Sequence, residues 1–204
     1  MAPKIVCIAG PTACGKTTLG VLLAQRFRGE VVSVDSMQIY RGMTVGTAAP
    51  TAEEMQGVPH HMIAVADPAE QWSAAEYVSR ATPVVDDILA RGKLPVLVGG
   101  TGLWMDALIR GHGFAKGHAG GAIRRELEAR LEREGIAPLL EELRQVDPES
   151  AERLHPADTK RILRALEVYR ETGSTISAHN AATRMIPPRY DAVWIGLQFA
   201  DRAD

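Results

Sequence analysis

The stretch Gly10-Pro11-Thr12-Ala13-Cys14-Gly15-Lys16-Thr17 decides the fold of this chain of 204 residues. It follows a short apolar run at residues 5–9 that is typical of a strand, and it precedes a segment at residues 18–27 that is typical of a helix. A strand, a glycine loop and a helix in that order form the context in which the pattern G-x-x-x-x-G-K-[ST] binds phosphate. The sequence therefore predicts a phosphate-binding loop near the amino-terminal end.

The residues of this loop suit a ligand with two or more phosphate groups. Gly10 and Gly15 allow backbone angles that other residues disfavour, so successive amide N–H groups can turn inward around an anion. The following helix adds its positive dipole end, Lys16 adds a full charge, and the Thr17 hydroxyl can hold a magnesium ion. A glycine-rich turn that only links strand to helix is the alternative, and the complete pattern argues against it. The predicted phosphate-binding residues are Gly10, Pro11, Thr12, Ala13, Cys14, Gly15, Lys16 and Thr17.

The composition is that of a globular protein without a strong charge bias. Hydrophobic residues make up 46% of the chain and the formal net charge is -2, so a nucleic-acid-binding surface would have to be a local patch. We interpret the two cysteines, Cys7 and Cys14, as free thiols in a reducing cytosol. No apolar run reaches the roughly 18 residues that a membrane helix needs, so we expect a cytoplasmic protein with no membrane partner.

Strands alternate with helices through the first half of the chain, which predicts an α/β fold, a doubly wound parallel sheet of the P-loop NTPase-like class. We expect further strands at 30–34 and 94–98, helices at 51–56 and 73–90, and a helix that opens at residues 99–102 (GGTG) and ends near 109. Residues 111–121 are rich in glycine, residues 122–173 are charged and helical, and strand character returns at 190–197. The expected domains are a core at 1–112, completed by 186–204, and a helical insertion domain at 113–185.

Asp35 follows the second predicted strand. Because ligands gather at the carboxyl ends of parallel strands, we expect Asp35 near the phosphate loop. From the residues alone, a role in the chemistry and a role as a helix cap or an outer ligand of magnesium are equal alternatives. The adjacent His60 and His61 have no cysteine or acidic partner at ligand spacing, and we interpret them as structural.

Several motifs, taken together, resemble the family of tRNA dimethylallyltransferases. They occur in the order of the family and extend over nearly the whole chain, so the set is specific although no single motif beyond the loop would suffice. The matching segments are 10–17, 35–40 (DSMQIY), 41–43 with 46–48, 57–61 (GVPHH), 73–75, 92–103 (GKLPVLVGGTGL), 155–156 and 161–169.

The resemblance implies transfer of a dimethylallyl group from dimethylallyl diphosphate to the exocyclic amine of the adenosine 3′ to the anticodon in tRNA. Asp35 resembles the general base of the family, while Lys16, Thr17 and Mg²⁺ would stabilise the leaving diphosphate. The expected tRNA contacts near the base are Asp35, Ser36, Met37 and Gln38, and the donors of Ser36 and Gln38 suit a flipped-out adenine.

The resemblance also implies a second set of tRNA contacts. Phosphate contacts by Arg and Lys on a helix face would hold the anticodon stem-loop. The alternatives are a plain helix cap for Thr101 and solvated ion pairs for the basic residues. We expect the protein to act as a monomer with tRNA and dimethylallyl diphosphate as its partners. The residues of this set are Thr101, Arg124, Lys160, Arg161, Ile162, Leu163 and Arg164.

The carboxyl-terminal end departs from the family pattern. Family members continue for about a hundred residues beyond the strand at 190–197, and that part supplies a further catalytic arginine and more of the tRNA contacts. We therefore expect either a fragment or a natural short form with impaired chemistry.

Three other functions compete with tRNA prenylation: prenylation of free adenine nucleotides, small-molecule phosphorylation, and a truncated nucleotide- or RNA-binding module without turnover. The helical segment argues against the first. The second is disfavoured because no acidic residue follows the strand at 94–98.

Overall fold

The computed structural model describes residues 2–111 and 121–200, and the chain divides into two compact units. The core unit contains Met1–His112 and Pro187–Asp204, and the helical unit contains Gly113–Ile186. The predicted domain boundary at 112/113 and most of the glycine-rich stretch lie at 112–120, outside the described residues.

The core unit is built on a parallel sheet. Its strands are β1 (Lys4–Ala9), β2 (Gly29–Ser33), β3 (His60–His61), β4 (Leu94–Gly99) and β5 (Asp191–Gly196), in the order β3-β2-β4-β1-β5. Every pairing is parallel. The predicted doubly wound α/β fold is confirmed. Strand β3 was not predicted, because two residues are too few to show an alternating pattern.

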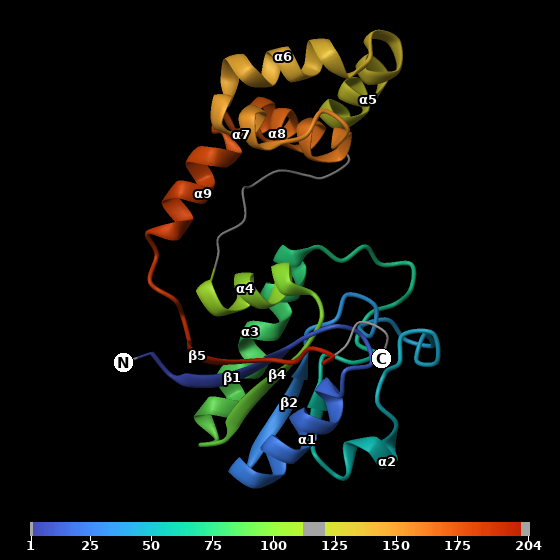
Figure 1. Ribbon diagram of the computed structural model, residues 1–204, viewed down its shortest axis with the longest axis vertical. Coiled ribbons are helices and arrows are strands. Elements are labelled where there is room, and N and C mark those ends of the chain that lie inside the picture. Colours follow the sequence, from blue (N-terminus) through green and yellow to red (C-terminus); the bar gives the residue numbers. More distant parts are fainter. Residues whose placement is uncertain (1, 112–120, 201–204) are drawn as a thin grey trace. The chain divides into compact units, whose positions relative to one another are not determined.

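Helices cover both faces of this sheet (Figure 1). Helix α1 (Lys16–Phe27) packs on one face, and α3 (Ala74–Ala90) and α4 (Gly102–Arg110) pack on the other. The short α2 (Ala52–Met55) lies within the predicted helix 51–56 and begins with a capping box of Thr51 and Glu54. Ser73 caps α3, since its hydroxyl accepts a hydrogen bond from the Glu76 amide. Side-chain caps and apolar spacing therefore set these helices locally.

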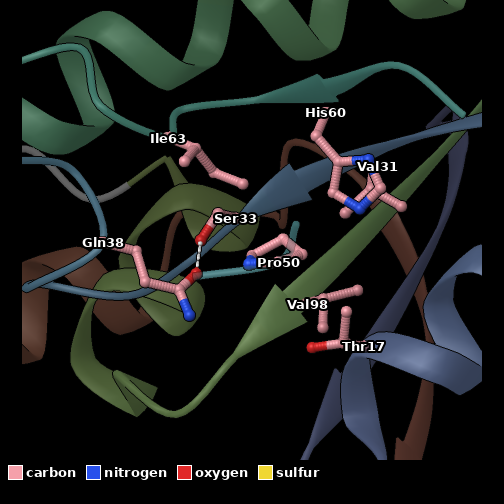
Figure 2. A pocket seen from close by; sticks show the side chains of 8 residues that line it. All are labelled: Thr17, Val31, Ser33, Gln38, Pro50, His60, Ile63 and Val98. Carbon is pink, nitrogen blue, oxygen red and sulfur yellow. Dashed lines mark hydrogen bonds between the residues drawn. The ribbon is translucent and has the colours of Figure 1, made fainter. Parts of the chain in front are cut away.

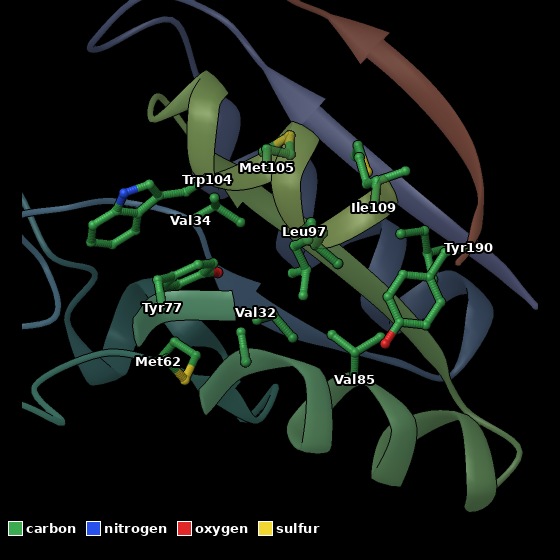
Figure 3. Packing of buried hydrophobic residues seen from close by; sticks show 14 of the residues in the cluster. Val32, Val34, Met62, Tyr77, Val85, Leu97, Trp104, Met105, Ile109 and Tyr190 are labelled. Carbon is green, nitrogen blue, oxygen red and sulfur yellow. The ribbon is translucent and has the colours of Figure 1, made fainter. Parts of the chain in front are cut away.

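The largest cluster of buried residues lies between the sheet and helices α3 and α4 (Figure 3). Within it, the rings of Tyr77 and Trp104 are stacked with their centroids 4.6 Å apart. The Tyr77 hydroxyl donates a hydrogen bond of 2.8 Å to the carbonyl of Ser33, and burial raises the pKa of Tyr77. Helix α3 is thereby attached to the carboxyl end of β2, next to Asp35.

One charged side chain, Glu30, lies in the otherwise apolar strand β2. Its side chain is 3% exposed and accepts hydrogen bonds from Arg91 (2.5 and 2.8 Å), Lys93 (2.6 Å) and His61 (2.7 Å). The hydrogen bonds from Arg91, and then those from Lys93 and His61, hold the pKa of Glu30 far below its usual range, although burial opposes them. Glu30 thus joins β2, β3 and the turn between α3 and β4.

The described part of the helical unit consists of α5 (Ala122–Glu134), α6 (Ile136–Val146), α7 (Pro148–Arg153), α8 (Thr159–Thr172) and α9 (Ile176–Arg184). Its own buried cluster is formed mainly by leucines of α5, α6 and α8. Asp147, which is 1% exposed, accepts hydrogen bonds from the Ser150 amide and from both the amide and the hydroxyl of Ser177, and so connects α7 with α9. Helix α9 was not predicted. In the part of the chain that the structure describes, no helix is long and apolar enough to cross a membrane.

Candidate active site

The predicted phosphate-binding loop connects β1 to α1, and its backbone has the positive φ angles that its glycine pattern predicts. Gly15 has a φ of 86°, which a residue with a side chain rarely adopts, and Ala13 has a φ of 64°. Helix α1 begins at Lys16, and its N-cap residue Gly15 provides no side-chain hydrogen bond. The first amide groups of α1 are therefore available to an anion.

Lys16 and Thr17 stand at the first turn of α1. The Lys16 ammonium group donates a hydrogen bond to the Pro11 carbonyl and lies 3.9 Å from the Cys14 sulfur. A bound phosphate would compete with these neutral acceptors for the charge of Lys16. Both Lys16 and Thr17 are half-buried.

Asp35 begins a turn at the carboxyl end of β2. Its Oδ1 atom accepts hydrogen bonds from the amides of Met37 (2.8 Å) and Gln38 (3.3 Å). Among the described residues, no hydrogen bond to Oδ2 is formed. Asp35 is half-buried. One carboxylate oxygen therefore fixes the local backbone, and the other makes no hydrogen bond in the described part of the chain.

Gln38 lies on the wall of a small pocket together with Thr17, and the remaining lining residues are Val31, Ser33, Pro50, His60, Ile63 and Val98 (Figure 2). The Gln38 amide nitrogen donates to the carbonyls of Thr47 (3.3 Å) and Ala48 (3.2 Å). Its side-chain oxygen accepts a hydrogen bond of 2.9 Å from the Ser33 hydroxyl. The predicted donor of Gln38 is thus already bonded to the following loop, and an adenine would have to compete for it.

His60 faces the same pocket from β3. Its Nδ1 atom donates a hydrogen bond of 2.8 Å to the Val58 carbonyl, and its buried Nε2 atom has no hydrogen-bond partner in the described structure. Burial lowers the pKa of His60, and the neighbouring His61 lowers it further. The lowered pKa favours the neutral imidazole, and His60 lines the pocket together with Thr17.

Thr101 lies at the N-cap of α4, but its hydroxyl does not cap that helix. Instead, Oγ1 accepts a hydrogen bond of 3.1 Å from the amide of Ser36. The plain cap considered for Thr101 is therefore wrong, because the hydroxyl is bound to a residue of a different loop. Asp35, Ser36, Met37, Gln38 and Thr101 form one hydrogen-bonded group at the carboxyl ends of β2 and β4.

The remaining predicted contacts belong to the helical unit. Arg124, Arg161 and Arg164 form ion pairs within it, at 2.8, 2.6 and 2.8 Å, with Glu128, Asp158 and Glu167. Lys160 is exposed on α8.

The prediction of tRNA contacts is wrong for the side chains of Ile162 and Leu163. Ile162 is 0% exposed and Leu163 is 1% exposed, and both pack in the core of the helical unit. They share helix α8 with the basic residues, but they lie on its apolar face and cannot contact tRNA with their side chains.

The predicted magnesium site fits the donors that the loop offers. Magnesium is usually held by one or two protein oxygens together with substrate phosphates and water, and the Thr17 hydroxyl is such a donor. No cluster of three or more His, Cys, Asp or Glu side chains that could hold a metal occurs among residues 2–111 and 121–200. Thr17 would therefore bind the ion only in combination with a phosphate ligand.

The sequence pattern of the IPP transferase family matches residues 38–204 of the chain. The chain belongs to this family. It is 48% identical over 203 residues to the tRNA dimethylallyltransferase of Caldanaerobacter subterraneus, covering 99% of this chain and 64% of that protein. It is 50% identical over 203 residues to the tRNA dimethylallyltransferase of Symbiobacterium thermophilum, covering 100% of this chain and 63% of that protein. The chain thus spans a little under two thirds of the length of these curated relatives.

Solved structures of other proteins are also similar to this chain. A full-length tRNA isopentenylpyrophosphate transferase from Bacillus halodurans has a TM-score of 0.60 and 46% identity, over 96% of this chain and 60% of that one. A eukaryotic dimethylallyltransferase acting on tRNA has a TM-score of 0.82 and 30% identity, over 97% of this chain and 48% of that one. The family resemblance drawn from the motifs is therefore confirmed.

Proposed function

We propose that this chain carries out the core of a prenyl transfer, in which a dimethylallyl group moves from dimethylallyl diphosphate to the exocyclic amine of the adenosine 3′ to the anticodon of a tRNA. Membership of the IPP transferase family supports this function. The relatives with this activity are longer than the chain, so its activity, substrates and partners are part of the proposal.

The observation that carries the proposal is the geometry of Asp35. Its Oδ1 atom is held by two backbone amides, and its Oδ2 atom is left for a proton. Gln38, in the same turn, shares a pocket with Thr17 of the phosphate loop. A carboxylate in the same turn as a residue that shares a pocket with the predicted phosphate loop suits a nucleophilic substitution at the carbon that carries the diphosphate.

The reaction balances with these groups. The amine nitrogen of adenosine forms a bond to C1 of the dimethylallyl group, and the bond between C1 and the diphosphate oxygen breaks. The diphosphate leaves with the electron pair of that bond and is stabilised by the loop amides and Lys16. The amine proton passes to Oδ2 of Asp35, a step typically worth 10²–10⁴-fold in rate. Mg²⁺ at Thr17 would supply further neutralisation of the diphosphate charge.

The partners follow from the same proposal. Lys160, Arg161 and Arg164 recur at helical spacing on α8, and together with Arg124 they would contact tRNA phosphates. In such contacts, each of the three arginines would leave its carboxylate partner in the protein and bind a tRNA phosphate. We propose a monomer that acts on tRNA in the cytosol, where the free thiols Cys7 and Cys14 remain reduced.

Purified protein tests the proposal directly. It is incubated with radiolabelled dimethylallyl diphosphate and magnesium, and with unmodified tRNA, AMP, or ATP plus small acceptors. We expect label on tRNA, and we expect Asp35→Asn to reduce the rate by about 10²–10⁴-fold. Asp67→Asn is the matched control, because Asp67 also accepts from the amide two residues ahead (2.9 Å) in a different loop.

Label on AMP and not on tRNA would overturn the choice of acceptor. Diphosphate binding without label on any acceptor would favour an inert binding module. An Asp35→Asn protein with the full rate would remove the proposed base.

A further inference from the structure

Thr101 makes an unusual use of its hydroxyl. A threonine at an N-cap normally accepts a hydrogen bond from an amide of its own helix. Here the amides of Trp104 and Met105 bond to the Thr101 carbonyl, and no side-chain cap is formed on α4. The hydroxyl oxygen accepts instead from Ser36, which is 65 residues away in the chain. The Thr101 hydroxyl therefore connects two loops and does not cap α4.

This connection holds both peptide groups that flank Asp35. On the amino-terminal side, the Val34 carbonyl accepts a hydrogen bond of 3.2 Å from the Thr101 amide. On the carboxyl-terminal side, the Ser36 amide donates a hydrogen bond of 3.1 Å to the Thr101 Oγ1 atom. One residue of the β4–α4 loop therefore fixes the backbone of Asp35 from both sides.

The two strands approach closely enough for this arrangement only because residue 99 is glycine. A Cβ atom at Gly99 would stand 2.0 Å from the Val34 carbonyl oxygen, far inside any real contact. The Val34 amide also donates a hydrogen bond of 2.8 Å to the Val98 carbonyl. The ends of β2 and β4 are thus joined on either side of Asp35 by backbone contacts and by the Thr101 hydroxyl.

We propose that Thr101 is a positioning residue for Asp35, holding the turn that aims its free carboxylate oxygen at the reacting amine. The inference rests on the proposed function only for the identity of the reaction. Through Ser36, Thr101 also supports the amides of Met37 and Gln38, which bind the other carboxylate oxygen. Loss of the Thr101 oxygen lets the turn move and misplaces the base, and misplacement of this kind lowers kcat.

This role differs measurably from a direct contact between Thr101 and tRNA. A contact made equally in the ground state and the transition state changes KM for tRNA and leaves kcat intact. A displaced general base lowers kcat with little change in KM. The two roles therefore separate in steady-state kinetics.

Two substitutions isolate the oxygen. Thr101→Val removes the acceptor and keeps the size and branching of the side chain, and Thr101→Ser keeps the acceptor. The matched control is Thr175→Val in the helical unit, where the Thr175 hydroxyl accepts from the Ala178 amide at the same distance of 3.1 Å. The first readout is kcat and KM for tRNA with radiolabelled dimethylallyl diphosphate. The second is amide hydrogen exchange at Ser36, Met37 and Gln38 by NMR, which requires no turnover.

For Thr101→Val, we expect kcat to fall by about 10- to 100-fold, as part of the 10²–10⁴-fold that a general base is worth, with KM for tRNA within about threefold. Thr101→Ser should restore kcat to within about threefold of the unmodified protein, and Thr175→Val should leave it unchanged. In Thr101→Val, all three amides should exchange at least about fivefold faster, the effect of losing one hydrogen bond.

A higher KM for tRNA with unchanged kcat would overturn the proposal, as would acceleration of the Ser36 amide alone. If the unmodified protein prenylates no acceptor, the proposed function fails, and exchange still decides whether Thr101 holds the Asp35 turn. If Thr101→Val does not fold, two other measurements still test the proposal. Fast exchange of the Ser36 amide in the unmodified protein would refute its hydrogen bond to Thr101. A loss of kcat in Thr101→Ser as large as that expected for Thr101→Val would refute the role of the hydroxyl oxygen.

Discussion

Replacing Glu30 by glutamine removes a buried charge and keeps the shape of the side chain. The Glu30 carboxylate receives four hydrogen bonds from Arg91, Lys93 and His61 and is 3% exposed. Glutamine retains one acceptor oxygen and turns an NH₂ group toward the cations. Removing one partner of a buried ion pair lowers the free energy of unfolding by about 3–5 kcal/mol. Arg91 and Lys93 are 38% and 41% exposed and can regain water, so we expect Glu30→Gln to destabilise the core unit by about 2–4 kcal/mol near neutral pH.

The effect should depend on pH in a defined direction. The folded protein holds the pKa of Glu30 below its usual value, whereas the unfolded chain has a pKa of about 4.3. A depressed pKa contributes stability that is complete above the unfolded pKa and is lost as pH falls toward the folded pKa. The difference between the unmodified protein and Glu30→Gln should therefore shrink below about pH 4.3, by about 1.4 kcal/mol for each pH unit.

Urea unfolding followed by tryptophan fluorescence measures this effect. The three tryptophans, Trp72, Trp104 and Trp194, all belong to the core unit, so their emission reports on that unit alone. The matched control is Asp106→Asn, which also removes one paired charge but at a side chain that is 46% exposed, and which should change stability by less than about 1 kcal/mol. Equal effects of Glu30→Gln and Asp106→Asn, or a Glu30→Gln effect that grows in acid, would refute the reasoning.

Three further predictions concern packing. Gly99→Ala should destabilise the core unit by more than about 3 kcal/mol because its Cβ would overlap the neighbouring strand, whereas Gly100→Ala, with no atom within 4 Å, should be nearly neutral; equal urea midpoints would contradict the close approach. Ile162→Ala should destabilise the helical unit by about 2–5 kcal/mol in unfolding followed by circular dichroism, while Lys160→Ala should leave stability unchanged and weaken tRNA binding; a stable Ile162→Ala protein would argue against its burial. Asp147→Ala should cost the same unit about 1–3 kcal/mol, because buried donors of α7 and α9 lose their acceptor; an unchanged circular-dichroism transition would argue against that link.

Sequence reasoning located most helices and strands because their signals are local. Helices α5 to α8 lie within the predicted helical segment 122–173, and α3 lies within the predicted helix 73–90. Each end of the four predicted strands lies within one residue of the observed end. Strand β3 was missed because its two residues are ordered by pairing with Val31 and Val32 of β2. Helix α9 was missed although Thr175 caps it locally, and Asp147, thirty residues earlier, adds support to its start that no local pattern shows.

The sequence also predicted the parts of the candidate site that depend on local patterns. The loop and Asp35 follow from motif and strand position, because each depends on residues that are neighbours in the chain. The prediction was wrong for the side chains of Ile162 and Leu163, because a motif match does not show which face of a helix is buried. The sequence gives one sign that Glu30 is paired, because it is a lone charge in an apolar strand. It does not indicate which basic side chains bind the carboxylate.

The local sequence predicts a phosphate-binding loop before a helix and a carboxylate at the end of the next strand. The side chains that lie beside this carboxylate became apparent only in the folded structure. Thr101 meets the turn of Asp35 because β4 lies beside β2 in the sheet and Gly99 allows the two strands to touch. Strand order and close approach arise from packing over the whole sheet, and a hydrogen bond between residues 65 positions apart leaves no local pattern by which the sequence could reveal it.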